Sequence, residues 1–494
     1  MSKKFTSVFI ISVAITMIFV LWGVISPTGL NDMTSNVQNE LKDKFGWLFL
    51  LGASIFLFFC IYLIFSKYGQ IKLGKDDEKP EYHLFTWFAM LFSAGMGIGL
   101  VFWGVAEPLY HYFSPPEATP ETTQAAREAM RYTFFHWGLH PWAIYTVLGL
   151  ALAYFKFRKG APGLISAVFY PVLGDRVKGP IGVFIDIIAV FATVFGVATS
   201  LGFGASQING GLSYLWGINN SFGVQSGIII AITLLFMLSA TTGLNKGIKM
   251  LSNLNMWFAL LLLAFVIIVG PTKFIMNTFT SSLGTYIQNL PVMSLDLGAF
   301  NLAKRDWAQS WTIFYWAWWI AWAPFVGMFI ARVSKGRTVR EFVLGVLFVP
   351  TLFGALWFSA FGGSGLFLQM SQGVDLYGIM SQNGTESALF AMLDQFPFSI
   401  ITMLLSLVLI STFFITSADS ATFVLGMQTT NGSLNPSTGV KLTWGFIIAA
   451  SAIVLLLSGG LQGLQTASII AAFPFLFILL GIVISLMKSF REEL

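Results

Sequence analysis

Twelve apolar segments, each long enough to cross a lipid bilayer as a helix, constrain what this chain can fold into. A helix needs about 20 predominantly apolar residues to span the hydrocarbon core. Only 10% of the 494 residues are charged, whereas soluble domains carry roughly 25%. The sequence therefore predicts an all-α integral membrane protein with twelve transmembrane helices. These lie near 5–26, 46–66, 84–106, 131–155, 181–206, 225–242, 250–270, 308–332, 341–365, 397–423, 441–460 and 468–488.

The positions of Lys and Arg predict the orientation of the chain. With the N-terminus in the cytoplasm, 20 of the 27 basic residues fall in segments on the cytoplasmic side, as the positive-inside rule requires. We expect a multi-pass protein of the cell (plasma or inner) membrane, surrounded by lipid, with both termini cytoplasmic. The net charge of +5 then reflects topology, and no nucleic-acid partner is expected.

Two of the predicted spans are irregular. The third contains SAGMGIG at 93–99, and the tenth contains TSADS at 416–420. Each glycine costs a helix roughly 1 kcal/mol relative to alanine. Broken or polar helices at membrane depth face protein or a water-filled cavity, and in transporters they mark substrate and ion sites. Alternatively, Gly95 and Gly99 form a small-xxx-small face for close helix packing.

Aromatic side chains gather in the fourth and eighth spans, which read FFHWGLHPWAIY at 134–145 and YWAWWIAWAPF at 315–325. The faces of aromatic rings attract cations, above all quaternary ammonium groups that hydrogen bonds cannot hold. Pro141 is expected to bend the fourth span and so to bring its aromatic residues together. The alternative is a belt of aromatic residues at the membrane surface. The paired clusters favour a cage for a betaine-like ligand.

Ionisable residues within the spans are candidates for function, because they are costly in a membrane. Asp419 lies beside Thr416 and Ser417, which suits either a hard cation such as Na⁺ or a hydrogen-bonded hub between helices. Asp186 is a second candidate. We expect Glu107 to lie at the outer surface of the membrane. His136 and His140, with no carboxylate nearby in sequence, are interpreted as structural and hydrogen-bonded.

One spacing along the chain relates two pairs of residues in the predicted spans. Met96 and Trp319 are separated by the same number of residues as Thr193 and Thr416. Five spans starting at the third and five starting at the eighth have opposite orientations in the membrane. This is the inverted-repeat arrangement of many secondary transporters.

Four long motifs carry a family resemblance: SAGMGIGLVFWGVAEPL (93–109), HWGLHPWAIY (136–145), FYWAWWIAWAPFVGMFIARVSKGRT (314–338) and FFITSADSATFVLG (413–426). With them the whole chain resembles the betaine/choline/carnitine transporter family, and most closely its Na⁺-coupled glycine betaine carriers. The resemblance implies twelve transmembrane helices, with a LeuT-like 5+5 inverted repeat on spans 3–7 and 8–12, and assembly as a homotrimer.

It also implies a division of the chain. Two N-terminal transmembrane helices occupy 1–83, and the first repeat occupies 84–270. An amphipathic connecting segment outside the cell occupies 271–307. The second repeat occupies 308–488, and a short cytoplasmic tail occupies 489–494.

The site residues follow from the same resemblance. The family's aromatic box and the path beside it fall on Trp137, Trp142, Tyr145, Trp318, Trp319 and Trp322. The glycine break, where backbone amides meet the ligand carboxylate, falls on Gly95, Met96, Gly97 and Gly99. The first sodium site falls on Ser93, Met96, Phe413, Thr416 and Ser417, and the second involves Thr193 and Phe325.

Three departures qualify the resemblance. The second sodium site expects a hydroxyl where Val197 stands, so its ligand set and a stoichiometry of two sodium ions are in question. Choline carriers tend to have an acid in the glycine break where this chain has Gly99, which favours a zwitterion. The long basic C-terminal helix of osmosensing members has no counterpart here.

The sequence thus predicts Na⁺-coupled symport of a quaternary-ammonium zwitterion by alternating access, with Na⁺ as the coupling ion and no other cofactor. The alternatives within the family are Na⁺-independent exchange of carnitine and betaine, and choline uptake. A membrane enzyme would need an acid–base pair or a metal cluster, and a channel would need an open pore lined by carbonyls or charges. The sequence motifs indicate neither.

Overall fold

The computed structural model describes residues 6–95, 97–242 and 245–494, with the side chains at 92–95, 239–242 and 245–249 left aside. In this part of the chain nearly all regular structure is helical, and the β pairing is a single bridge between Lys72 and Thr338. The α-helices are α1 (Ser7–Ile25), α2 (Pro27–Phe65), α3 (Leu84–Gly95), α4 (Ile98–Phe113), α5 (Thr123–Trp137), α6 (Leu139–Ala153), α7 (Tyr170–Leu173), α8 (Pro180–Trp216), α9 (Phe222–Thr242), α10 (Asn245–Val269), α11 (Thr272–Leu295), α12 (Leu302–Ser310), α13 (Thr312–Val333), α14 (Val339–Ser371), α15 (Leu376–Asn383), α16 (Ala388–Leu393), α17 (Ser399–Gln428) and α18 (Thr438–Glu493).

Five short helical turns complete the described elements: η1 (Lys67–Gln70), η2 (Tyr154–Arg158), η3 (Ser166–Phe169), η4 (Gly174–Lys178) and η5 (Thr385–Ser387). They lie between the long helices. The prediction of an all-helical membrane protein is confirmed.

Among the described residues, nine helical segments are long and apolar enough to cross a membrane. Three features account for the difference from the twelve segments expected. The expected third span is divided between α3 and α4. The apolar part of α9 covers only Phe222–Leu238. Finally, α18 runs through both C-terminal segments, with Gly460 as a kink at φ 57°.

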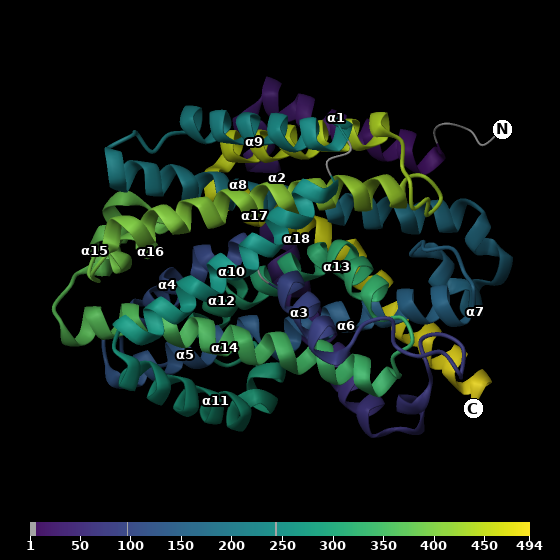
Figure 1. Cartoon of the computed structure of the whole chain (residues 1–494), viewed down its shortest axis with the longest axis horizontal. Helices are drawn as coiled ribbons and strands as arrows, with labels where there is room; N and C mark the ends of the chain where they lie inside the picture. The colour runs from purple at the N-terminus through teal and green to yellow at the C-terminus, as the bar shows by residue number, and fades with distance from the viewer. Residues whose placement is uncertain (1–5, 96, 243–244) are drawn as a thin grey trace.

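The core of the molecule is built around α13, which packs against α6, α8 and α18. Most of its side chains are buried, including Trp316, Trp318 and Trp319. A helix that is apolar all round belongs in the interior of a bundle. Most of the long helices lie side by side along the long axis of the molecule, and α11 lies along one edge, next to α14 (Figure 1).

Two helix breaks border this core. Gly97 is extended (φ −159°, ψ 180°) and separates α3 from α4. Gly138 (φ −98°, ψ −131°) separates α5 from α6. Pro141 therefore stands in the first turn of α6, where its missing N–H removes no hydrogen bond of the helix. In a continuous helix its ring would clash with the carbonyl group of Trp137. The expected bend exists, as a break one turn before the proline.

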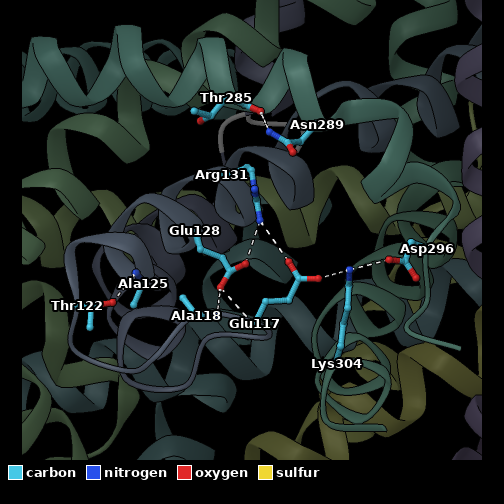
Figure 2. A network of polar contacts seen from close by, with 10 residues as sticks. All are labelled: Glu117, Ala118, Thr122, Ala125, Glu128, Arg131, Thr285, Asn289, Asp296 and Lys304. Carbon is cyan, nitrogen blue, oxygen red and sulfur yellow. Dashed lines mark hydrogen bonds and ion pairs between the residues drawn. The ribbon is translucent and has the colours of Figure 1, made fainter. Parts of the chain in front are cut away.

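An ionic network holds α12, which leads directly into α13. The Lys304 ammonium donates to Glu117 at 2.6 Å and to Asp296 at 2.7 Å. Arg131 of α5 donates to Glu128 at 2.9 Å and lies 3.9 Å from Glu117. Figure 2 shows the two cations on either side of Glu117. The hydrogen bond from Lys304 holds the pKa of Asp296 below its usual range. The network thus ties the α4–α5 loop to α5 and α12.

We expect Lys304→Gln to lower the melting temperature of the purified protein by about 1 °C, because Glu117 and Asp296 lose the cation they share. The loss corresponds to about 1 kcal/mol, since both carboxylates are partly exposed. The matched control is Arg305→Gln, because Arg305 is 40% exposed and pairs only with its neighbour Asp306 among the described ion pairs. Thermal unfolding in detergent at low and high salt measures both, and salt should shrink the difference. Equal melting temperatures at low salt would contradict this role of Lys304.

Candidate ligand-binding cavity

A cavity lies at the centre of the bundle, beside both helix breaks. The space not filled by atoms here, counted together with the solvent at its opening, is about 740 Å³. Elements from both halves of the chain form its wall, with α4, α6, α13 and α14 contributing most. Its lining residues are Gly97, Ile98, Gly99, Leu100, Trp137, Pro141, Trp142, Tyr145, Ser200, Trp318, Trp319, Trp322, Pro350, Phe353, Gly354 and Ser417.

The aromatic rings in this wall face different directions around the space. Trp319 lies 4.9 Å from Trp137 and 6.1 Å from Tyr145, centroid to centroid, and is nearly perpendicular to both. Trp142 lies 5.5 Å from Tyr145 at 78°, whereas Trp318 stacks on Trp319 at 5.0 Å. Such an arrangement presents both ring faces and ring edges to the cavity. It suits a compact cation that touches several faces at once.

Hydrogen bonds from the indole nitrogens fix the orientation of these rings. Trp319 donates to the backbone carbonyl of His136 at 2.9 Å. Trp322 donates to the backbone carbonyl of Gly196 at 2.6 Å. Among the described residues, the buried Tyr145 hydroxyl and Trp318 Nε1 have no hydrogen-bond partner. Tyr145 is also one of the residues that line the cavity.

The N-terminus of α4 provides a site for an anion at the same cavity. The helix starts at Ile98 directly after the extended Gly97, so its first N–H groups have no partner within the helix. These groups and the helix dipole attract a carboxylate. A Cβ atom on Gly99 would lie 2.6 Å from Cη2 of Trp318 and 3.0 Å from Cη2 of Trp137. Gly99 therefore lets α4 approach the rings.

The residues expected at the first sodium site lie mainly on α17. Phe413 and Thr416 are buried, and Ser417 lines the cavity. The Thr416 hydroxyl accepts from Asn255 Nδ2 at 3.1 Å and donates to the Thr412 carbonyl at 2.9 Å. Ser93 lies in the last turn of α3 and Gly95 ends that helix, but the Ser93 side chain and the whole of Met96 lie outside the described residues. Three of the five expected residues are therefore placed on α17, and one of them, Ser417, lines the cavity.

The residues expected at the second sodium site have other partners. Thr193 donates to the Ala189 carbonyl at 2.7 Å and to Gln428 Oε1 at 3.4 Å. Phe325 packs on Trp322, with ring centroids 5.2 Å apart. Val197 is buried and apolar. None of the described contacts joins Thr193 to Phe325.

Glu107 is fully buried among protein side chains, a packing that its expected depth near the outer membrane surface did not predict. Its carboxylate accepts from His111 Nε2 at 3.1 Å and from His136 Nδ1 at 2.8 Å. The other oxygen accepts from Trp137 Nε1 at 2.7 Å and from the Tyr315 hydroxyl at 2.5 Å. Pro108 does not end the helix, because α4 continues to Phe113. The sequence carried one signal for this cluster: Glu107 and His111 lie one turn apart in an apolar helix.

His136, His140 and Asp186 have hydrogen-bond partners within the protein. His140 Nε2 lies 3.1 Å from the Ser294 hydroxyl, and His136 pairs with Glu107, so the interpretation of both histidines as hydrogen-bonded is confirmed. Asp186 accepts from the backbone and hydroxyl of Ser166 at 2.9 and 2.7 Å. Asp419 is half-buried on α17. The buried histidine cluster around Glu107 has the donor atoms of a metal site within 4.8 Å of one another, but hydrogen bonds already use them.

Comparisons with known proteins extend over the whole chain. Residues 7–494 match the model of the betaine/carnitine/choline family transporters. The chain is 58% identical to the glycine betaine transporter OpuD of Bacillus subtilis, over 100% of this chain and 96% of that protein. It is 45% identical to the ectoine/hydroxyectoine transporter of Virgibacillus pantothenticus, over 99% and 96% of the two chains. It is 43% identical to the glycine betaine transporter of Acinetobacter baylyi, over 99% of this chain and 73% of that protein.

Proposed function

Because the chain belongs to the betaine/carnitine/choline transporter family, we propose that it imports a glycine betaine-like zwitterion together with Na⁺. It is a multi-pass membrane transporter of the betaine and ectoine type, not an enzyme. The observation that carries the proposal is the central cavity, which places aromatic faces and a helix N-terminus on the same small space.

The two ends of glycine betaine match the two parts of this wall. The trimethylammonium group fits among Trp137, Trp142, Tyr145 and Trp319, where each ring contributes roughly 0.5–2 kcal/mol. The carboxylate fits at the free N–H groups that begin α4. Trp318 supports the stack behind Trp319, and Trp322 with Phe325 continues the aromatic wall toward the cytoplasm. We assign Gly95, Met96, Gly97 and Gly99 to the carboxylate end of the ligand.

Sodium provides the driving force in this proposal. A betaine has no net charge, so the membrane potential alone cannot concentrate it. One coupled Na⁺ adds about 2.3 kcal/mol per 100 mV. We assign the ion to Ser93, Met96, Phe413, Thr416 and Ser417, where it would join α17 to the broken α3–α4 segment. Thr193 and Phe325 form a second site only if another group replaces the hydroxyl lost at Val197.

Removing both hydroxyls of Thr416 and Ser417 by alanine substitution should raise the sodium concentration for half-maximal betaine uptake at least about tenfold. The reason is that Na⁺ needs oxygen ligands, while the aromatic cage itself is unchanged. The matched control is Ser411→Ala on the same helix, because Ser411 bonds only to the Leu407 carbonyl among the described contacts. Uptake into proteoliposomes over a range of sodium concentrations measures the effect. A sodium dependence equal to that of wild type would remove Thr416 and Ser417 from the site.

The same assignment extends to the whole molecule. We propose twelve spans, with both termini in the cytoplasm, and a LeuT-like inverted repeat that relates 84–270 to 308–488. In this arrangement 1–83 forms two peripheral helices, 271–307 contains the connecting helix α11, and 489–494 is a short tail. The rocking of one repeat against the other would give alternating access. A homotrimer in the cell membrane completes the proposal.

Transport in proteoliposomes tests the function directly. Radiolabelled glycine betaine, ectoine, carnitine and choline are offered with and without an inward sodium gradient. Betaine accumulation that requires the gradient is expected. Accumulation in potassium buffer, driven by carnitine inside the vesicles, would instead identify a sodium-independent exchanger. Preference for choline would contradict the assignment of the α4 N-terminus to a carboxylate, and preference for ectoine would change the substrate but keep the site.

A further inference from the structure

Glu107 is a buried carboxylate that the proposed transport cycle does not use. Four donors converge on it from three helices: His111 of α4, His136 and Trp137 of α5, and Tyr315 of α13. An ionised carboxylate can only accept, and an indole N–H can only donate. The donor set therefore suits the charged form of Glu107.

Among the described residues, lysine and arginine do not supply the opposite charge for this carboxylate. In the described part of the chain, no Lys or Arg forms an ion pair with Glu107, and only His111 and His136 lie within salt-bridge distance. Each histidine needs just one N–H for its bond, and His136 Nε2 lies 3.0 Å from the Thr312 hydroxyl, so neutral rings satisfy the geometry. A buried charge without an opposite charge beside it is costly even when hydrogen bonds satisfy it. Its retention beside the cavity calls for a cation from elsewhere.

Two of the four donors connect Glu107 to the aromatic cage. Trp137 lines the cavity and lies edge-on to Trp319. Tyr315 lies 5.5 Å from Trp137 and 6.1 Å from Trp319. A hydrogen bond from an indole N–H to an anion polarises the ring and makes its face more negative, which strengthens its attraction for a cation. The buried ring of Trp137 both lines the cavity and donates to Glu107 at 2.7 Å, so the charge itself also acts on the cavity through surroundings of low dielectric constant.

We propose that Glu107 is the counter-charge of the bound ligand's cationic head, acting through Trp137 and Tyr315, and that it selects ligands with a positively charged headgroup. The inference rests on the proposed betaine transport. Glu107 lies behind the rings and does not line the cavity, so it is a specificity-determining residue that acts through others.

The test uses two ligands of the same shape and different headgroup charge. Glycine betaine carries a trimethylammonium group, and 3,3-dimethylbutanoate carries a neutral tert-butyl group in its place, with the same carboxylate. The affinities of both are measured by titration calorimetry on the purified full chain. Glu107→Gln should weaken betaine binding at least about tenfold and change binding of the isostere less than about twofold. A purely structural loss would weaken both ligands equally, and that result would overturn the proposal.

Three comparisons keep the test decisive. Glu386→Gln removes another buried carboxylate, one that bonds to Asn220 instead of a cage residue, and should leave both affinities unchanged. Glu107→Asp keeps the charge and should keep the preference for betaine. If Glu107→Gln does not fold, the same charge change is made in a second background, by comparing Trp137→Phe with the double variant Trp137→Phe/Glu107→Gln. In this background there is no indole N–H at position 137 that could lose its acceptor. In this pair too, loss of charge should reduce the preference for betaine.

The outcomes also separate this inference from the proposed function. Failure of the wild type to bind betaine would refute the function itself. A wild type that binds betaine, together with a Glu107→Gln variant that keeps the full preference for betaine over the isostere, would refute only the role of Glu107.

Discussion

Glycine betaine uptake is expected to fall to less than about a tenth of wild type when Trp319 is replaced by leucine. Trp319 is the ring that connects the two aromatic clusters, because it contacts Trp137 and Tyr145 from the first half of the chain and stacks on Trp318. Leucine fills part of the volume but has no π face. The loss of one ring face, at roughly 0.5–2 kcal/mol, and of the ring contacts that orient its neighbours amounts to a tenfold or larger loss of affinity.

Two further substitutions distinguish loss of the cage from loss of the fold. Trp319→Phe retains an aromatic face and should keep measurable uptake with a raised KM. Trp216→Leu makes the same chemical change as Trp319→Leu at the end of α8, where the side chain is 59% exposed, and should leave uptake unchanged. Initial uptake rates in proteoliposomes with equal amounts of protein give the comparison. Wild-type uptake by Trp319→Leu would refute the assignment of the cage.

The second large effect is expected from a substitution that adds only one methyl group. Gly99→Ala should abolish high-affinity betaine binding, because the added methyl group would lie 2.6 Å from Trp318 and 3.0 Å from Trp137. Real Cβ atoms do not approach other atoms so closely, and both rings are buried. Either the rings turn or α4 withdraws, and each change separates the aromatic faces from the helix N-terminus. A shift of about 1 Å at such a site is enough for a hundredfold loss.

Gly97→Ala is the matched comparison for this substitution. Gly97 also lines the cavity, but a Cβ atom there meets nothing within 4 Å, and its extended backbone accepts any residue. We expect Gly97→Ala to alter betaine affinity much less than Gly99→Ala does. Calorimetric titration of both variants, with folding checked by monodisperse elution, measures the difference. Equal affinities in the two variants would show that the contact between Gly99 and the rings is unimportant.

Local sequence patterns predicted the all-helical membrane architecture and named many of the residues that line the cavity. Apolar segments of the right length identify the helices, because a membrane leaves the backbone few other options. The glycine break and the aromatic runs are contiguous in sequence, so Gly97, Trp137 and Trp319 could be selected without any knowledge of packing. The break before α6 was predicted from Pro141, although the non-helical residue proved to be Gly138.

Features that depend on distant parts of the chain could not be predicted. Glu107 appears near the end of an apolar segment, and its partners on α5 and α13 are far away in sequence, so it was expected at the outer surface. Phe353 and Gly354 of α14 line the cavity, but they belong to an ordinary apolar helix. Thr193 and Phe325 were paired by resemblance alone, whereas the structure gives each a different partner. Long-range packing decides all three cases.

An experimental structure of the protein with bound glycine betaine tests the central claim most directly. The account predicts density for the trimethylammonium group enclosed by Trp137, Trp142, Tyr145 and Trp319, with the carboxylate at the start of α4. Density for the ligand at any other place, with these four rings in contact only with one another, would contradict it.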